Sequence, residues 1–119
     1  MKKIDTTWKI FSAYVLVLLL MLLTNLVTAQ VVVTQFNAEW NSTNDVEWFK
    51  KLNDCELAKV DIVKEPKLQD KHKIVIVPTI IIFKDGEEIK RFQADLSFKM
   101  LATKREIQQF INEQIMSDF

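Results

Sequence analysis

Few side chains in this 119-residue sequence could carry covalent chemistry. It contains one cysteine, Cys55, and one histidine, His72. A disulfide within one chain needs two cysteines and a Cys/His metal site needs several ligands, so we expect neither a disulfide nor a metal site. A single glycine excludes a glycine-rich phosphate loop. The remaining candidates for chemistry are one thiol and the side-chain amides.

Two asparagines stand three residues apart in the segment Trp40-Asn41-Ser42-Thr43-Asn44. An amide can neither become a thiolate nor accept a sulfur atom. Asparagine is, however, one of the best residues for the first position of a helix, where its side chain binds free backbone N–H groups. We therefore expect Asn41 and Asn44 to shape the start of a helix instead of reacting.

The hydrophobic pattern predicts the elements that position this segment. A helix between each of the first three strands predicts that those strands run parallel, and Asp85-Gly86 predicts a hairpin that adds an antiparallel edge. Capping boxes are expected at Ser42 with Asp45 and at Thr103 with Glu106. The result is an α/β sandwich of order β-α-β-α-β-β-α, with strands at 31–36, 56–63, 79–84 and 87–92 and helices at 42–52, 66–72 and 103–115.

The first 29 residues are of a different kind. Lysines precede an uncharged apolar run from Ile10 to Ala29, and small side chains end it at Val27-Thr28-Ala29. This is the layout of a secretory signal, which predicts cleavage after Ala29, export to the periplasm or cell envelope, and a domain of residues 30–119. The alternative is a retained membrane anchor, because the run approaches the roughly 20 residues that span a bilayer. An uncleaved segment would hold the domain close to the membrane.

The element order and three motifs resemble the thioredoxin superfamily. Residues 36–40, FNAEW, are similar to the aromatic-rich approach to the Cys-x-x-Cys of that family. Residues 77–79, VPT, resemble its cis-proline loop, and residues 83–87, FKDGE, resemble its hairpin. The resemblance covers residues 31–115. Family members usually begin with a further strand and helix, so it implies a trimmed thioredoxin-like fold.

The resemblance implies that the dithiol site has been lost. Asn41 and Asn44 occupy the two cysteine positions. Gln35 stands where the family often has a buried acid that helps move a proton, and Lys59 stands at the position of a family lysine. We expect a hydrogen bond between Gln35 and Lys59, and no oxidoreductase activity through a pair of thiols.

A partner groove is the family feature that needs no thiol. In the family, the residue before the cis-proline offers backbone groups to an extended peptide, and the tryptophan forms a wall of the groove. Trp40, Val77 and Pro78 are the matching residues, and Val77-Pro78 is expected to be cis. The alternative is that Trp40 only packs and Pro78 only shapes a turn. Further apolar contacts are possible at Trp48, Phe98 and Met100.

The remaining chemical candidates have plainer interpretations. Cys55 is either a single-cysteine redox sensor or a small buried hydrophobic residue, and we expect the second. His72 lies in a lysine-rich turn and is expected to face solvent. Equal numbers of basic and acidic residues, 16 each, give no charge surplus for nucleic acid.

Three functions follow. The first is a redox-inactive thioredoxin-like module of the cell envelope that binds a protein or an extended peptide, without a cofactor. The second is a thiol oxidoreductase that works through Cys55 alone. The third is an accessory subunit of a larger envelope complex. The residues determine neither the partner nor the oligomeric state, and only residues 1–29 offer contact with a membrane.

Overall fold

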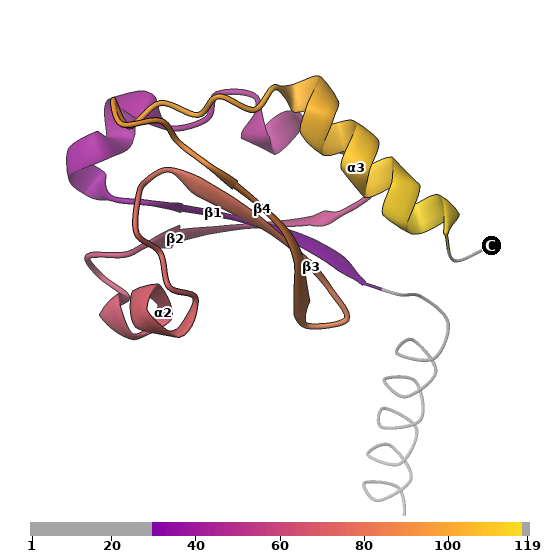
Figure 1. Cartoon of the computed structure of the whole chain (residues 1–119), viewed down its shortest axis with the longest axis horizontal. Coiled ribbons are helices and arrows are strands. Elements are labelled where there is room, and N and C mark those ends of the chain that lie inside the picture. The colour runs from indigo at the N-terminus through magenta and orange to yellow at the C-terminus, as the bar shows by residue number, and fades with distance from the viewer. Residues whose placement is uncertain (1–29, 118–119) are drawn as a thin grey trace, which may run out of the picture.

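A computed structural model describes residues 30–117, which form one mixed sheet with helices on both faces (Figure 1). The predicted signal or anchor lies outside the described residues, and its cleavage stays a prediction. The elements are strands β1 Val31–Asn37, β2 Glu56–Asp61, β3 Thr79–Lys84 and β4 Glu87–Gln93, the 3₁₀ helices η1 Glu39–Asn44 and η2 Phe49–Lys51, and the α-helices α2 Pro66–Lys71 and α3 Lys104–Met116.

The strand order in the sheet is β2-β1-β3-β4. β1 pairs in parallel with β2 and antiparallel with β3, which pairs antiparallel with β4. The predicted parallel arrangement of the first three strands is therefore wrong for β3. A parallel return would have to carry the chain back along a strand of about 20 Å. α2 has only six residues, or about 9 Å, so β3 starts at the edge where β2 ends.

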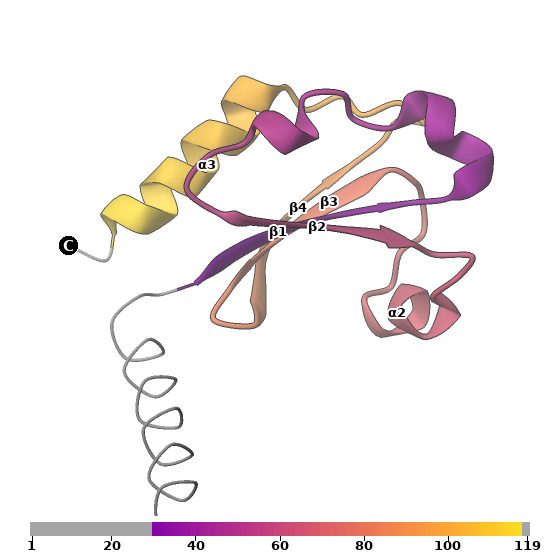
Figure 2. The ribbon, with the colours of Figure 1, turned by 180° about the vertical axis from the view of Figure 1, so that it is seen from behind.

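Two hydrophobic clusters lie on the two faces of the sheet, one on each face. α3 and the 3₁₀ helices lie on one face, and α2 lies on the other (Figure 2). Alternate residues of a strand point to opposite faces, so Val33 and Ile82 belong to the larger cluster with α3, whereas Phe36 and Ile81 belong to the smaller cluster. The apolar residues of the central strands thus contribute side chains to the clusters on both faces of the sheet.

The predicted hairpin and closing helix are confirmed. Asp85 and Gly86 have φ values of 53° and 83°, and two positive values suit the tight two-residue turn that joins twisted strands. The Thr103 side chain accepts a hydrogen bond from the Glu106 backbone N–H at 3.2 Å, as an N-cap does. Ile107 and Ile111 are fully buried, as the helical spacing predicts.

The helix predicted over residues 42–52 does not form as one element. It is replaced by η1 and η2, and no side-chain cap is present at η1, so the predicted capping box at Ser42 is wrong. Tertiary hydrogen bonds compete with the helix here. The Val46 N–H donates to Gln35 Oε1 at 3.0 Å, and the Asp45 side chain accepts from Asn37 and Lys59. Asp45 itself is extended, with ψ of 141°, which ends the first segment.

Candidate functional site

The candidate site lies where β1 ends and β3 begins. η1 follows β1 directly, and the Val77-Pro78 bond precedes β3, so the paired strands bring the two motifs to the same edge of the sheet. The Val77-Pro78 bond is cis, which confirms that prediction. Val77 is 2% exposed and Asn41 is 4% exposed, so the motifs meet in a buried environment.

Asn41 is the centre of this meeting point. Its Nδ2 donates to Asn37 Oδ1 at 3.1 Å and lies 3.4 Å from each of two backbone oxygens, those of Val77 and Phe98. Because an amide nitrogen carries only two hydrogens, the two longer contacts share one donor. One side chain therefore joins the end of β1, the cis-proline loop and the loop that follows β4.

Two further asparagines complete the amide network. Asn44 Nδ2 donates to Asn41 Oδ1 at 2.8 Å, and Asn37 Nδ2 donates to the Asn41 backbone oxygen at 3.2 Å and to Asp45 Oδ1. The spacing of Asn41 and Asn44 does bring their side chains together. Asn37 is a site residue that the motif alone does not reveal, although a polar residue that ends an apolar strand is a usable signal.

The capping role predicted for Asn41 is wrong. Asn41 lies inside η1, whose N-terminal flanking residue is Ala38, and its side chain bonds to other loops instead of to free N–H groups of its own helix. The amide thus bridges segments that are far apart in sequence. This needs a strong acceptor and strong donors on the same short side chain, which asparagine supplies, whereas the thiol of cysteine is only a weak donor and a weak acceptor.

Trp40 and Phe98 form an exposed aromatic pair beside the network. The two rings meet edge to face, with centroids 5.4 Å apart and planes at 90°. Trp40 is 62% exposed, so it is not part of the hydrophobic core. Phe98 lies beside Trp40, and a partner contact there stays a prediction, whereas Trp48 and Met100 pack against the larger core cluster.

The loop that carries Phe98 is ordered by Asp95. Asp95 Oδ1 accepts from the backbone N–H of Ser97 at 2.8 Å and of Lys99 at 3.2 Å, and also from the Ser97 hydroxyl. The hydrogen bond from Ser97, together with those from the backbone, holds the pKa of the Asp95 carboxyl below its usual range. Phe98 adopts φ of 64°, a left-handed conformation that is rare for a bulky residue. These bonds hold the ring beside Trp40.

Gln35 and Lys59 do not form the predicted hydrogen bond. They are register partners in the parallel pair, but Gln35 Oε1 accepts from Val46 N–H, and Lys59 Nζ donates to Asp45 Oδ2 at 3.2 Å. Gln35 is fully buried, and its Nε2 has no hydrogen-bond partner within the described residues. The side-chain amide of Gln35 is therefore only half satisfied.

Cys55 lies at the opposite end of the sheet from Asn41. It directly precedes β2, whose first residue is next to the start of β1, whereas Asn41 follows the end of β1. The seven residues of β1 span about 23 Å. Partial burial, and then the charge of Asp54, raise the pKa of the Cys55 thiol. Cys55 packs against the larger core cluster, as expected of a small hydrophobic residue.

His72 is not freely exposed, so that prediction is wrong. Its ring lies 5.4 Å from the Phe36 ring and 5.3 Å from the Phe83 ring, between centroids. Desolvation, followed by the charge of Lys71, lowers the pKa of the imidazole. Two aromatic contacts place His72 in the packing beneath the sheet, not in a site.

A search of the described part of the chain finds no group of three or more acidic, histidine or cysteine side chains that could hold a metal ion. Within the same residues, 30–117, no helix is both long and apolar enough to cross a bilayer.

Comparison with known proteins gives the family. Residues 23–113 match the family model described as Thioredoxin, which is more than half of the chain. The chain therefore belongs to the thioredoxin family. A curated relative, Thioredoxin Y1, chloroplastic, from Arabidopsis thaliana, is 41% identical over 51 residues, which are 43% of this chain and 30% of that relative. The matched stretch thus spans less than a third of that relative.

Solved thioredoxins share the fold. A point mutant of thioredoxin from Halobacterium salinarum NRC-1 superposes with a TM-score of 0.59 at 23% identity, covering 73% of this chain and 76% of that chain. The reduced thioredoxin pre-protein from Schistosoma mansoni gives 0.58 at 25% identity, covering 79% and 88%. The chain is thus a member of the thioredoxin family that contains a single cysteine, Cys55.

Proposed function

We propose that this chain is a thioredoxin-family protein without dithiol chemistry that binds a protein partner in an extended conformation. The observation that carries the proposal is the Asn41 side chain, which bonds to the cis-proline loop and to the Phe98 loop. A side chain that links both loops holds in place the two segments that would form the walls of the proposed groove. Dithiol exchange needs two thiols, and the sequence has one.

Several features support binding at this edge. Trp40 and Phe98 offer an exposed aromatic surface, and Val75, next to the cis-proline loop, is 82% exposed. Aromatic anchors of this kind supply much of the free energy in protein interfaces. Strand-like pairing between a partner and backbone groups near Val77 requires no reactive side chain. An extended apolar segment of another protein fits these features best.

The test is capture of partners by the tagged full-length chain from detergent-solubilised membranes and from the soluble fraction. Trp40→Ala should lower the yield of the specific partner by at least about tenfold, because loss of a central aromatic anchor typically costs about 2 kcal/mol or more. Met116→Ala is the matched control, since Met116 is 72% exposed but lies at the end of α3. Equal loss in both variants, or in neither, would contradict the groove.

A Cys55 oxidoreductase is the weaker alternative. The thiol is partly buried, its pKa is raised, and it lies at the wrong end of the sheet for the groove. An insulin-reduction assay separates the two functions. We expect no reduction above that of a Cys55→Ser variant, and a clear excess over that variant would favour the oxidoreductase.

The proposed location is the periplasm or cell envelope, with residues 1–29 as an export segment. Support comes from the basic start and the uncharged run from Ile10 to Ala29. Mass spectrometry of the native N-terminus tests it. A mature chain that begins at Gln30 would support cleavage, whereas an intact peptide across Ala29 would support a retained anchor. Fixed stoichiometry with other membrane subunits after purification would favour the accessory-subunit alternative.

A further inference from the structure

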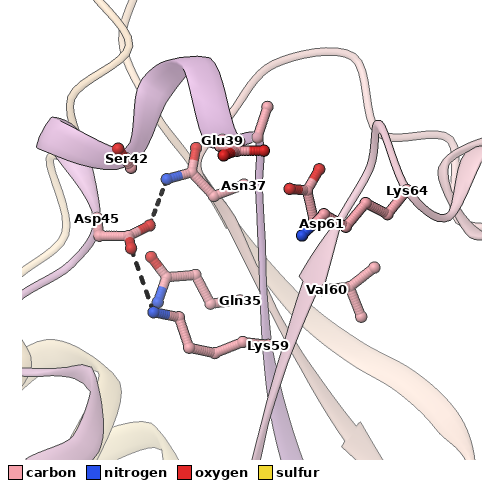
Figure 3. A pocket seen from close by; sticks show the side chains of 10 residues that line it. Gln35, Asn37, Glu39, Ser42, Asp45, Lys59, Val60, Asp61 and Lys64 are labelled. Carbon is pink, nitrogen blue, oxygen red and sulfur yellow. Dashed lines mark hydrogen bonds and ion pairs between the residues drawn. The ribbon is translucent and has the colours of Figure 1, made fainter.

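A pocket separate from the aromatic groove lies over the ends of β1 and β2 (Figure 3). Its volume is about 430 Å³, which is within the range of small-molecule sites. Register pairs Gln35 with Lys59 and Asn37 with Asp61, so four polar side chains of one sheet face line its floor. The carboxyl ends of parallel strands are the usual position for ligands in open α/β sheets.

The floor of this pocket contains a donor without an acceptor. Gln35 Nε2 has no hydrogen-bond partner within residues 30–117, although the residue is fully buried. Figure 3 shows this nitrogen turned toward the ammonium group of Lys59. Leaving a buried amide donor unpaired is unfavourable, because it has lost its hydrogen bonds to water. Lys59 already donates to Asp45 but has further N–H groups, so one negatively charged oxygen atom could accept from both Gln35 Nε2 and Lys59 Nζ.

The charges of the lining restrict what that oxygen can belong to. Glu39, Asp45 and Asp61 contribute three carboxylates, against two ammonium groups from Lys59 and Lys64, so the lining carries one excess negative charge. A phosphate or a dicarboxylate would be repelled. A single carboxylate is acceptable, particularly if a positive charge on the same molecule meets the acidic side of the pocket.

The acidic side lies within reach of such a molecule. Lys59 and Asp61 are two residues apart on one face of β2, which separates them by about 6.6 Å along the strand. Glu39 lines the same pocket from η1 (Figure 3). A molecule with opposite charges a few ångströms apart could therefore bind both groups at once.

We propose that this pocket binds a small zwitterion of the amino-acid type. Its carboxylate accepts hydrogen bonds from Gln35 Nε2 and Lys59 Nζ, and its ammonium group faces Glu39 and Asp61. Lys59 keeps Asp45 as a second partner, since an ammonium group has three donors. Asp45 also bonds to Asn37, so an occupied pocket would contact the amide network of the groove.

Titration of the ¹⁵N-labelled full-length chain in detergent tests this site. The probes are L-alanine, which carries both charges, acetate, methylamine and inorganic phosphate. L-alanine should shift the side-chain amide resonance of Gln35 in a saturable manner. Acetate should bind at least about tenfold more weakly, because it lacks the group that meets the acidic side. Methylamine and phosphate should leave the Gln35 resonance unchanged.

Two variants locate the effect. Gln35→Glu keeps the acceptor for Val46 but places a carboxylate against the ligand, and it should abolish the response of the neighbouring backbone resonances. Lys59→Met changes a side chain that is 47% exposed, and it should weaken binding by about tenfold. Lys67→Met, on the exposed face of α2, is the matched control and should bind L-alanine as the wild type does.

The outcomes are decisive in both directions. Saturable binding of L-alanine that depends on Gln35 and Lys59 supports the site. No saturable shift, or shifts that persist in both variants, would mean that solvent alone occupies the pocket, and the proposal would be wrong. If acetate bound as tightly as L-alanine, the proposed contact between the ligand's ammonium group and the acidic side chains would be wrong. Trp40 is not part of this pocket. The partner-capture experiment with Trp40→Ala can therefore fail while the L-alanine titration succeeds.

Discussion

The two ends of the β1–β2 strand pair carry similar amide side chains but use them differently. Where β1 ends, Asn37 and Asn41 are 6% and 4% exposed and bond to each other and to two loops. Where β2 begins, Gln108 of α3 accepts from the Asn53 N–H at 2.8 Å and donates to the Asn53 oxygen at 3.0 Å, in contact with solvent. An exposed group that loses a partner can bond to water, whereas a buried one cannot.

The one thiol sharpens this contrast. Cys55 lies at the exposed end of the pair, and Asn41 and Asn44 lie at the buried end. The side chains of the two asparagines form a structural junction between loops. Cys55 has no second cysteine in the sequence with which it could form a disulfide.

The largest expected effect is chemical. In a Cys55→Ser background, Asn41→Cys with Asn44→Cys should form a disulfide on mild oxidation. The two side chains already meet, with Nδ2 and Oδ1 2.8 Å apart, and η1 keeps them one turn apart. Titration of free thiols before and after reduction measures it. A folded double variant that keeps both thiols free under oxidant would show that the geometry is unsuitable, and Asn41→Cys alone is the control.

Next in size is the loss of the buried network. Asn41→Leu should lower the free energy of unfolding by about 2–3 kcal/mol, because Asn37 Oδ1 and Asn44 Nδ2 lose their partner and the first is buried. Urea denaturation gives the value. Asn53→Ala is the control, since only backbone atoms of Asn53 bond to Gln108, and it should change stability by less than about 0.5 kcal/mol. Similar losses of unfolding free energy in both variants would show that the buried and exposed ends of the strand pair do not differ in this respect.

A smaller effect is expected at the exposed end. Gln108→Ala removes both bonds to Asn53 and one to Asn112, yet it should cost only about 1 kcal/mol because water replaces them. The same denaturation experiment applies. A cost above that of Asn41→Leu would show that exposure does not govern these amides.

The smallest expected effect concerns Cys55. Because its pKa is raised, less thiolate is present near neutral pH than in an unfolded cysteine peptide. Alkylation of the folded chain should therefore be slower than that of the denatured chain near neutral pH, and the rate should rise only at a higher pH. A rate profile that is shifted toward acid would indicate an activated thiol and revive the oxidoreductase alternative.

Elements with strong local patterns could be predicted from the sequence. The Asp85-Gly86 turn, the Thr103 cap and the buried face of α3 follow from residue type and spacing alone. The cis bond at Val77-Pro78 followed from family resemblance. These features depend on neighbours a few residues away, or on a motif that keeps its conformation across a family.

The errors arise where distant residues decide the local structure. A single helix over 42–52 has adequate periodicity, but the hydrogen bonds that Val46 donates to Gln35 and that Asp45 accepts from Asn37 hold residues 45 and 46 out of it. Asn41 acts as a bridge because Val77 and Phe98 come beside it only in the folded chain. The direction of β3 follows from the short length of α2, which the predicted helix over 66–72 already indicated but which the prediction of parallel strands did not take into account.

The direction of β1 has a consequence for where a partner could be reached. Gln30, the first described residue, precedes the start of β1, and Trp40 follows its end. The strand separates these points by about 23 Å. If residues 1–29 were kept in a bilayer, the sheet would act as a spacer. The groove would then be held away from the lipid and would be open to proteins in the aqueous compartment, and the surface nearest the bilayer would be the end that carries Cys55.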